Sequence, residues 1–364
     1  MRIDNIETFL IRLPFETGDT AKDWRGGRTL DYVLIRIDTD AGVSGWGDAF
    51  GYGAAHATKA AVDRMVAPSL IGKDARDIAG ISHSLQRSNH IWGRYGVTMF
   101  AISGIDIALW DIAGKAAGLP VHRLLGGPAH DTLPGYASLL HCPDAEAVAA
   151  RTGEAVALGY RHIKLHETTV PAVRAAREAM GPDIAMMIDT NCPWTPGEAR
   201  EMAAKFRPFD PYWLEEPIFP PEDFASLARL QAESGIAIAA GENACTAFEF
   251  QRMFDAGAVT FAQPSVTKVG GITEFRKIQA LAESRGITVI PHSPYFGPGF
   301  LATLHLLAAS ARPSLMERFF CTPEASLAGD FINAENCVFK VPDGPGLGHD
   351  PDPDILRDYR DDAA

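Results

Sequence analysis

Three acidic residues at even spacing are the part of this sequence best suited to chemistry. Asp189, Glu215 and Glu242 each follow a short apolar run, AMMI, YWL and AIAAG respectively. Three carboxylates buried together without compensation repel one another and shift toward protonation, which is costly. A divalent cation with oxygen ligands removes that cost, and Mg²⁺ is the usual choice because it keeps positions open for substrate oxygens. We therefore predict a Mg²⁺ site. The alternative is that each carboxylate caps the following helix or pairs with a lysine.

A lysine and a histidine two residues apart are suited to act on a carboxylate substrate. Lys164 and His166 flank Leu165 in the segment YRHIKLH, and the period of two in a strand places both side chains on one face. A lysine there can neutralise a substrate carboxylate, and a histidine can accept a proton near neutral pH. Two alternatives stay open: a lysine paired with a carboxylate, and a core histidine held by a backbone carbonyl.

A second histidine, His292, lies in the segment VIPHSPYFGPG. If it faces His166 across a metal, the two rings bracket a substrate carbon. One then acts as a base, and the other acts as an acid or as the base of the opposite face. The alternative is a residue at a helix N-terminus that takes no part in chemistry.

Other polar positions are predicted to support the site. Glu317, in LMERF, either hydrogen-bonds a developing enolate oxygen if it is kept protonated, or pairs with Lys164 or Arg318. The Gly-rich stretch DWRGGR is predicted to be a loop of the kind that often closes a barrel mouth. The predicted substrate-binding or supporting residues are Asn191, Ser265, Tyr295, Trp24 and Arg25.

The spacing of these residues predicts the elements that position them. Short apolar runs alternate with Ala/Glu/Arg-rich stretches from about residue 129, which is typical of parallel strands joined by helices. Successive polar residues at the strand ends are separated by 25, 26, 27, 23, 27 and 25 positions. This is about one βα unit of a (β/α)₈ barrel of ~250 residues, which builds its active site at those ends. The residues counted are Lys164, Asp189, Glu215, Glu242, Ser265, His292 and Glu317.

The rest of the chain predicts a capping domain. Apolar sets of period two in residues 1–60 indicate a meander of about three antiparallel strands, and residues 55–118 change to helical spacing. Residues 132–140 supply the first barrel strand. We predict an α/β protein with an α+β capping domain (1–128), a modified (β/α)₈ TIM barrel (129–325) and a C-terminal segment (326–364) that packs on the capping domain and completes it.

Composition excludes several classes of protein. Apolar residues make up 46% and charged residues 22%, a balance that excludes a disordered chain or a membrane span. Lys and Arg total 33 against 46 Asp and Glu, so the net charge of −13 argues against nucleic acid and anionic lipid as partners. The N-terminal segment lacks the pattern of a secretory signal, so we expect a cytoplasmic protein. Five scattered cysteines indicate neither a disulfide framework nor a zinc site.

The motifs together resemble the mandelate racemase-like subgroup of the enolase superfamily, over essentially the whole chain. The matching segments are GIDIALWDIAGKAAG, KLH, IDTN, WLEEP, GEN, KVGGITE and PHSPYFGPG. The resemblance implies a capping domain over a modified barrel, Mg²⁺ held by the three carboxylates, and abstraction of the proton α to a carboxylate to give an enediolate. It implies that Lys164 and Glu317 contact the substrate carboxylate and that His166 is the base. It also implies a homo-oligomer, a dimer or an octamer.

Two positions depart from the pattern of that subgroup. The usual KxK motif is Lys164-Leu165-His166 here, and Ser265 stands where an Asp orients the seventh-strand histidine. Ser265 can hydrogen-bond His292 but adds no negative charge, so His292 is expected to be a weaker base than in relatives with that Asp, and either to act mainly as an acid or to take no part in the reaction. Lys268 lies three residues beyond the sixth-strand base position and is not assigned that role.

These observations favour a Mg²⁺-dependent lyase that dehydrates an acid sugar or a related 2,3-dihydroxy carboxylate. A racemase or epimerase of a hydroxy acid or amino acid derivative is the alternative enzyme. It requires two competent bases on opposite faces, and Ser265 counts against it. The third hypothesis is a non-catalytic binding protein. Failure to bind Mg²⁺ would be its main support.

Overall fold

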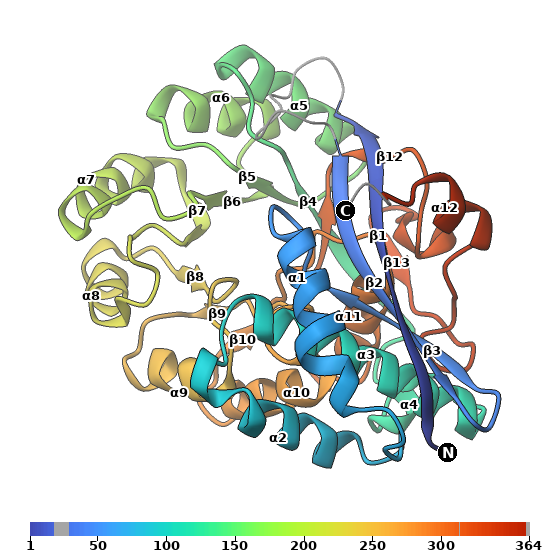
Figure 1. The fold of residues 1–364 in the computed structure, drawn as a ribbon. Coiled ribbons are helices and arrows are strands. Elements are labelled where there is room, and N and C mark those ends of the chain that lie inside the picture. Colours follow the sequence, from blue (N-terminus) through green and yellow to red (C-terminus); the bar gives the residue numbers. More distant parts are fainter. Residues whose placement is uncertain (18–28, 313, 362–364) are drawn as a thin grey trace.

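The computed structural model describes residues 1–17, 29–312 and 314–361, and opens with an antiparallel sheet (Figure 1). Strand β2 (Thr29–Thr39) pairs with β1 (Ile3–Glu16) on one side and with β3 (Ser44–Ala49) on the other. The short strand β12 (Thr322–Pro323) pairs with the free edge of β1. The predicted three-stranded meander is therefore present, and a fourth strand from much later in the chain extends it.

Helix α3 (Val97–Ala117) packs between this sheet and the barrel. It is long and apolar enough to cross a membrane, but 83% of its most apolar window is buried inside the protein. A Cβ atom at Gly47 would lie only 1.9 Å from the carbonyl oxygen of Gly104, so β3 and α3 approach each other where only glycine fits. The helix ends at Gly118, whose φ of 66° is the left-handed conformation usual for a C-terminal cap.

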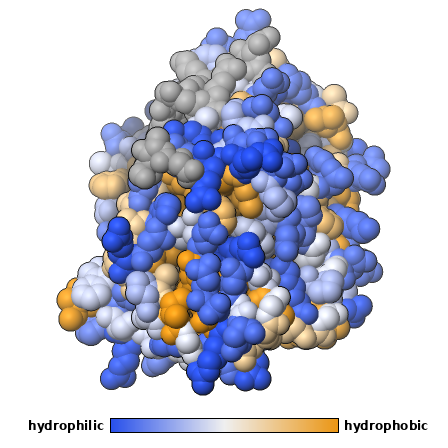
Figure 2. Space-filling model, turned by 45° about the vertical axis from the view of Figure 1, so that its right-hand side comes forward, coloured by the Kyte–Doolittle hydropathy of each residue, from blue (hydrophilic) through white to orange (hydrophobic). Residues whose placement is uncertain are grey.

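The capping domain also contains several shorter helical segments. They are α1 Ala55–Ala61, the π-helical turn Val62–Val66, the 3₁₀ turns Ala67–Ser69 and His90–Trp92, and α2 Ile78–Ser88. Figure 2 shows one face of the molecule, where hydrophilic residues predominate and hydrophobic residues form separate small patches. This surface agrees with the acidic composition of the chain.

Eight parallel strands of the described chain form the second sheet, in the order β10-β9-β8-β7-β6-β5-β4-β11. The strands are β4 Thr132–Ser138, β5 His162–Leu165, β6 Ala185–Asp189, β7 Pro211–Glu215, β8 Ile238–Ala240, β9 Phe261–Ala262, β10 Thr288–Val289 and β11 Met316–Phe319. The first and last strands of this order, β10 and β11, are connected by hydrogen bonds that involve side chains. The Ser314 hydroxyl donates to the Val289 carbonyl at 2.6 Å, and the Ser293 N–H donates to Glu317 at 2.7 Å. The predicted modified TIM barrel is confirmed.

Helices surround this sheet on the outside (Figure 1). They are α4 Val121–Leu124, α5 Ala145–Ala157, α6 Val170–Met180, α7 Pro196–Phe206, the 3₁₀ turn Arg207–Phe209, α8 Phe224–Ser234, α9 Ala247–Asp255, α10 Gly271–Glu283 and α11 Pro298–Ala308. Side-chain caps begin several of them soon after a strand ends. In α7 the Thr195 side chain and Glu198 form a capping box, and Thr246 caps α9. Where such a cap is present, it fixes the point at which the helix begins after the strand.

Apolar side chains fill the barrel interior below the polar strand ends. Tyr136, Met187, Trp213 and Phe261 form one buried cluster, as expected for the layered core of this fold. The rings of Tyr136 and Trp213 meet edge to face at 6.0 Å, and the Trp213 indole N–H donates to Glu215 Oε2 at 2.9 Å. The core thus supports one of the predicted metal ligands directly.

The C-terminal segment contacts both parts of the molecule. Strand β13 (Val338–Lys340) pairs with β4 of the barrel, whereas helix α12 (Pro353–Asp358) lies beside the capping sheet. The Arg12 N–H donates to the Tyr359 carbonyl at 3.0 Å, and a 3₁₀ turn spans Gly329–Ile332. Because β12 joins the capping sheet at residue 322, the chain reaches that domain slightly before the predicted boundary.

Two buried histidines join the capping domain to the barrel. His122 of α4 and His305 of α11 lie with their Nδ1 atoms 3.0 Å apart. Burial lowers the pKa of His305 to about 3, and burial also lowers the pKa of His122. In the unfolded chain His305 binds a proton near pH 6.5, whereas in the folded chain it does so only near pH 3. The folded state therefore loses stability as the pH falls below 6.5.

We expect His305 to make the protein acid-sensitive. Its contribution is a loss of stability that grows as the pH falls further below 6.5. Urea unfolding at pH 7 and pH 4.5 should therefore show a smaller acid-induced loss in His305→Gln than in the wild-type protein. His83→Gln, at an exposed position of α2, is the control. An equal acid-induced loss in all three proteins would contradict the assignment.

Candidate active site

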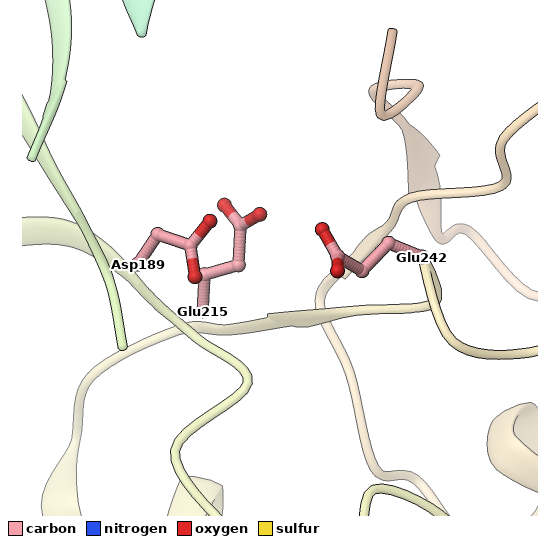
Figure 3. Close-up of side chains that lie close together, drawn as sticks. All are labelled: Asp189, Glu215 and Glu242. Atoms are coloured by element: carbon pink, nitrogen blue, oxygen red, sulfur yellow. The ribbon is translucent and has the colours of Figure 1, made fainter. Parts of the chain in front are cut away.

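The three predicted carboxylates meet at the C-terminal ends of adjacent strands. Asp189 ends β6, Glu215 is its partner in the register at the end of β7, and Glu242 follows β8 by two residues. One ligand oxygen from each lies within 4.8 Å of the others. Figure 3 shows Asp189 and Glu215 side by side, with Glu242 pointing toward them from the facing side. This is an all-oxygen donor set of the kind that Mg²⁺ prefers.

The electrostatics of the cluster also suit a cation. Burial and the neighbouring charge of Asp189 raise the pKa of Glu215 well above its ordinary value. Although burial raises the pKa of Asp189 too, Lys164 and His166 outweigh it and hold that pKa well below its usual range. Asp189 Oδ2 is buried and accepts no well-directed hydrogen bond. A buried acceptor and an unfavourable pair of charges are both relieved by a divalent cation, so the residues fit Mg²⁺.

Lys164 lies among carboxylates. Its ammonium is 3.0 Å from Glu215 Oε1, 3.2 Å from Asp189 Oδ2 and 3.1 Å from Glu317 Oε1, and the residue is 1% exposed. Burial lowers the pKa of an ammonium, but the charges of Glu215 and Glu317 outweigh it and hold the Lys164 pKa well above its ordinary value. The alternative of a lysine paired with carboxylates is therefore realised. In this arrangement Lys164 supplies positive charge beside the carboxylates.

His166 lies just beyond β5 with its two ring nitrogens on different partners. Nδ1 contacts the carbonyl oxygen of Leu139, and Nε2 lies 3.2 Å from Asp189 Oδ2. A carbonyl can only accept, so Nδ1 carries the hydrogen and Nε2 is the atom directed at the carboxylate cluster. Since the carbonyl and the carboxylate both only accept, this geometry matches the imidazolium; the neutral ring, with its hydrogen on Nδ1, is the form that takes a proton on Nε2.

His292 reaches the cluster from the strand on its other side. Its Nε2 lies 3.0 Å from Glu242 Oε2, and its Nδ1 lies 3.2 Å from the Ser265 hydroxyl, which confirms the predicted serine contact. Because the carboxylate only accepts, a neutral ring carries its hydrogen on Nε2 and Nδ1 accepts from Ser265. Ser265 in turn hydrogen-bonds the Tyr295 phenol, whose pKa burial raises so that it stays protonated. Burial also lowers the His292 pKa, and the charges of Glu242 and Glu317 do not offset it.

The remaining predicted residues fall into three groups. Glu317 pairs with Lys164 rather than Arg318, and although burial raises its pKa, Lys164 and His292 hold it below its usual value. The second predicted possibility, a pair with Lys164, is therefore the one seen here, and the role of Glu317 as a protonated donor toward the substrate stays a prediction. The Asn191 N–H donates to Asp189 Oδ1 at 3.1 Å. Trp24 and Arg25 lie outside the described residues.

A cavity of about 1230 Å³ opens above the carboxylates and is lined by both domains. The capping domain contributes Asp48 and Phe50, and the barrel contributes Lys268 and Glu216, none of which we predicted as site residues. Asp48 is buried and accepts the Gly299 N–H at 3.3 Å, and burial raises its pKa to about 7. The spacing of strand ends gives no signal for such residues, because the packing of one domain on the other brings them to the site.

Two family models together match most of the chain. Residues 147–355 match the model described as enolase C-terminal domain-like. Residues 20–126 match the N-terminal domain of mandelate racemase and muconate lactonizing enzyme.

Individual relatives cover nearly the whole chain. It is 35% identical over 359 residues to a 3,6-anhydro-α-L-galactonate cycloisomerase of Streptomyces coelicolor, covering 95% of this chain and 96% of the relative. It is 33% identical over 301 residues to a D-galactonate dehydratase of Ralstonia nicotianae, covering 79% and 78%. A crystal structure of a racemase from Streptomyces coelicolor with bound magnesium superposes with a TM-score of 0.84 at 31% identity, covering 99% of this chain and 100% of the other.

Proposed function

The chain belongs to the mandelate racemase and muconate lactonizing enzyme family of the enolase superfamily, and we propose that it is a Mg²⁺-dependent acid-sugar dehydratase. The reaction removes the proton α to a carboxylate and expels the hydroxyl on the next carbon. The observation that carries this proposal is the unlike setting of the two histidines: His166 is tied to a backbone carbonyl and His292 to a hydroxyl. Relatives named D-galactonate and arabinonate dehydratase support the substrate class.

Asp189, Glu215 and Glu242 would hold the Mg²⁺ ion. When bound, Mg²⁺ supplies positive charge that favours loss of the α-proton from a carboxylate substrate. The Lys164 ammonium adds a second positive charge at the same place. Glu317 holds the Lys164 ammonium from the far side at 3.1 Å and is itself fixed by the Ser293 N–H.

His166 takes the α-proton. Nδ1 is committed to the Leu139 carbonyl, so the proton is received on Nε2 while the C–H electron pair enters the enediolate. Asp189 Oδ2, 3.2 Å from Nε2, stabilises the positive ring. A positioned general base of this kind contributes roughly 10²–10⁴-fold to a rate.

His292 completes the dehydration. The protonated ring of His292 gives a proton from Nε2 to the 3-hydroxyl as the C3–O bond breaks and so returns to its neutral form, while the enediolate electrons form the C2–C3 double bond. Water leaves, and the enol that remains tautomerises to a 3-deoxy-2-keto acid. His292 is needed here only as a proton donor, which a serine beside Nδ1 permits.

Racemisation is the second candidate, because both histidines reach the carboxylates from different strands and one solved relative is named a racemase. It would require His292 to act as a base as strong as His166. No carboxylate lies within 4.0 Å of its Nδ1 in the described part of the chain, where Ser265 is the partner. The setting of His292 therefore favours dehydration.

We expect His292→Gln to separate the two steps. Exchange of the α-proton should continue within about 10-fold of the wild-type rate, whereas loss of water should fall by roughly 10²-fold, the usual contribution of a general acid. Proton NMR in D₂O follows both rates in one sample. His56→Gln, at an exposed position of α1, serves as the control. A parallel loss of exchange and dehydration would contradict the division of roles.

The proposed reaction is tested by its product. The protein with Mg²⁺ is incubated with aldonic and aldaric acids, and a reagent for 3-deoxy-2-keto acids reports turnover. Formation of that product from at least one acid is expected, whereas an epimer without loss of water would move racemisation to first place. The cytoplasmic location and the homo-oligomeric state stay predictions.

A further inference from the structure

Within the described ranges of the chain, no anionic group forms an ion pair with one buried lysine of the cavity. Lys268 lies between β9 and α10, lines the cavity and is 6% exposed. Its backbone N–H donates to the Ser265 carbonyl at 2.9 Å, and the Phe50 N–H of the capping domain donates to the Thr267 carbonyl at 3.4 Å. The segment that carries Lys268 is thus held at the seam between the two domains.

Two aromatic rings, and no carboxylate, surround its ammonium. Lys268 Nζ lies 4.9 Å from the Phe50 ring centre and 6.0 Å from that of Phe100. Among the residues that the structure describes, none places a carboxylate oxygen within 4.0 Å of Nζ. Glu216, the acidic neighbour on the same cavity wall, already binds Asn243 Nδ2 at 2.6 Å and the Cys192 thiol at 3.4 Å. Ring faces only partly replace the water that a buried ammonium loses.

Lys164, the other lysine of the cavity, is surrounded by carboxylates. Lys164 is within 3.2 Å of three carboxylates, whereas Lys268 has no carboxylate of the described residues within 4.0 Å. A substrate with one carboxylate satisfies the metal site and leaves Lys268 without a carboxylate in contact. A ligand with a second negative charge at its other end supplies that contact inside the cavity.

We propose that Lys268 binds a second carboxylate of the substrate, remote from the carbon that loses its proton, so that the preferred substrates are diacid sugars. This inference rests on the proposed function, because it takes the first carboxylate to lie at the Asp189–Glu215–Glu242 cluster. Lys268 then determines specificity: it takes no part in proton transfer and selects the far end of the ligand. Phe50 and Phe100 keep water from its ammonium, so a carboxylate there is bound more strongly than at the surface.

Binding of matched acids tests this inference. Each aldaric acid is paired with the aldonic acid of the same configuration, which carries a hydroxymethyl group in place of the second carboxylate. Calorimetry with Mg²⁺ present measures Kd, using the His166→Asn background so that substrate is not consumed. We expect the diacid to bind roughly 10- to 100-fold more tightly, as a hydrogen-bonded charge pair contributes. Lys268→Met should remove that preference and change monoacid binding by less than about 3-fold.

Two further variants distinguish charge from other effects. Lys268→Gln keeps a hydrogen-bond donor without the charge, so it should behave like Lys268→Met if a carboxylate is bound. Restored affinity in Lys268→Gln would show that a hydroxyl is recognised instead. Lys205→Met, at an exposed position of α7, controls for a lost lysine charge elsewhere. Thermal unfolding midpoints establish that each variant is folded.

The inference is overturned if no diacid binds more tightly than its monoacid partner, or if Lys268→Met weakens both equally. Failure of the proposed function has a different signature. In that case wild-type protein exchanges no α-proton with any acid, whereas the Lys268-dependent preference for diacids persists in the binding measurement.

Discussion

Substitution of His166 by asparagine is expected to lower the rate of α-proton exchange by roughly 10³-fold, the middle of the range for a lost general base. The asparagine side chain can still donate to the Leu139 carbonyl, but it offers no basic nitrogen near Asp189. Substrate binding should change little, because Lys164 and the carboxylate cluster are left intact. Loss of the α-proton signal in D₂O, followed by proton NMR, measures the effect.

His162→Asn is the matched control for this substitution. His162 begins the same strand, β5, and packs its ring against Tyr212 at 5.9 Å, away from the cavity. Its variant should exchange the α-proton at close to the wild-type rate. Exchange at the normal rate in His166→Asn would mean that another group is the base.

Removal of the metal is expected to abolish the reaction, and Glu215→Gln should weaken Mg²⁺ binding severely. Glu215 is fully buried and would share the cation with Asp189 and Glu242, so its substitution by glutamine replaces a full charge with a weak dipole. Substitution of a residue that only hydrogen-bonds a metal ligand typically lowers metal affinity by about 10- to 100-fold. We expect Glu215→Gln, which changes a ligand itself, to lower Mg²⁺ affinity by at least about that factor. Titration calorimetry with Mg²⁺ measures the change, and a chelator followed by excess Mg²⁺ tests reversibility.

Glu201→Gln controls for the loss of one acidic charge, because Glu201 is exposed on α7 and far along the helix from the cluster. Its Mg²⁺ affinity should equal that of the wild-type protein. Failure of the wild-type protein to bind Mg²⁺ would support the hypothesis of a non-catalytic binding protein. Full activity in the presence of a chelator would contradict the metal assignment.

The even spacing of the polar residues at the strand ends was enough to predict most of the fold and the centre of the site. Parallel strands buried on both faces are short apolar runs, so the first polar residue after each run marks the barrel mouth. This holds even for β9 and β10, which are only two residues long in the structure, because Ser265 and His292 still reach each other at 3.2 Å. The chemistry of single residues was less predictable. Glu317 pairs with Lys164, one of the possibilities that the sequence left open, and that choice depends on side-chain packing.

Residues at the seam of the two domains could not be predicted from one sequence. Asp48 and Phe50 lie near the end of β3, far from the barrel in the chain, and reach the cavity only when α3 packs between the sheet and the barrel, where the Phe50 ring meets Lys268. Their residue types are also those of ordinary core and turn positions. The segment KVGG marks Lys268 as part of a motif, but the sequence alone does not say that its ammonium faces the cavity.

The most direct test of the account is exchange of the α-proton in D₂O by the wild-type protein. The protein with Mg²⁺ is mixed with acid sugars, mono- and diacids alike, and proton NMR follows the signal at the carbon next to the carboxylate. We predict that this signal disappears for at least one acid, and that a 3-deoxy-2-keto product appears with it. Retention of every α-proton by a protein shown to bind Mg²⁺ would contradict the central claim that His166 removes it.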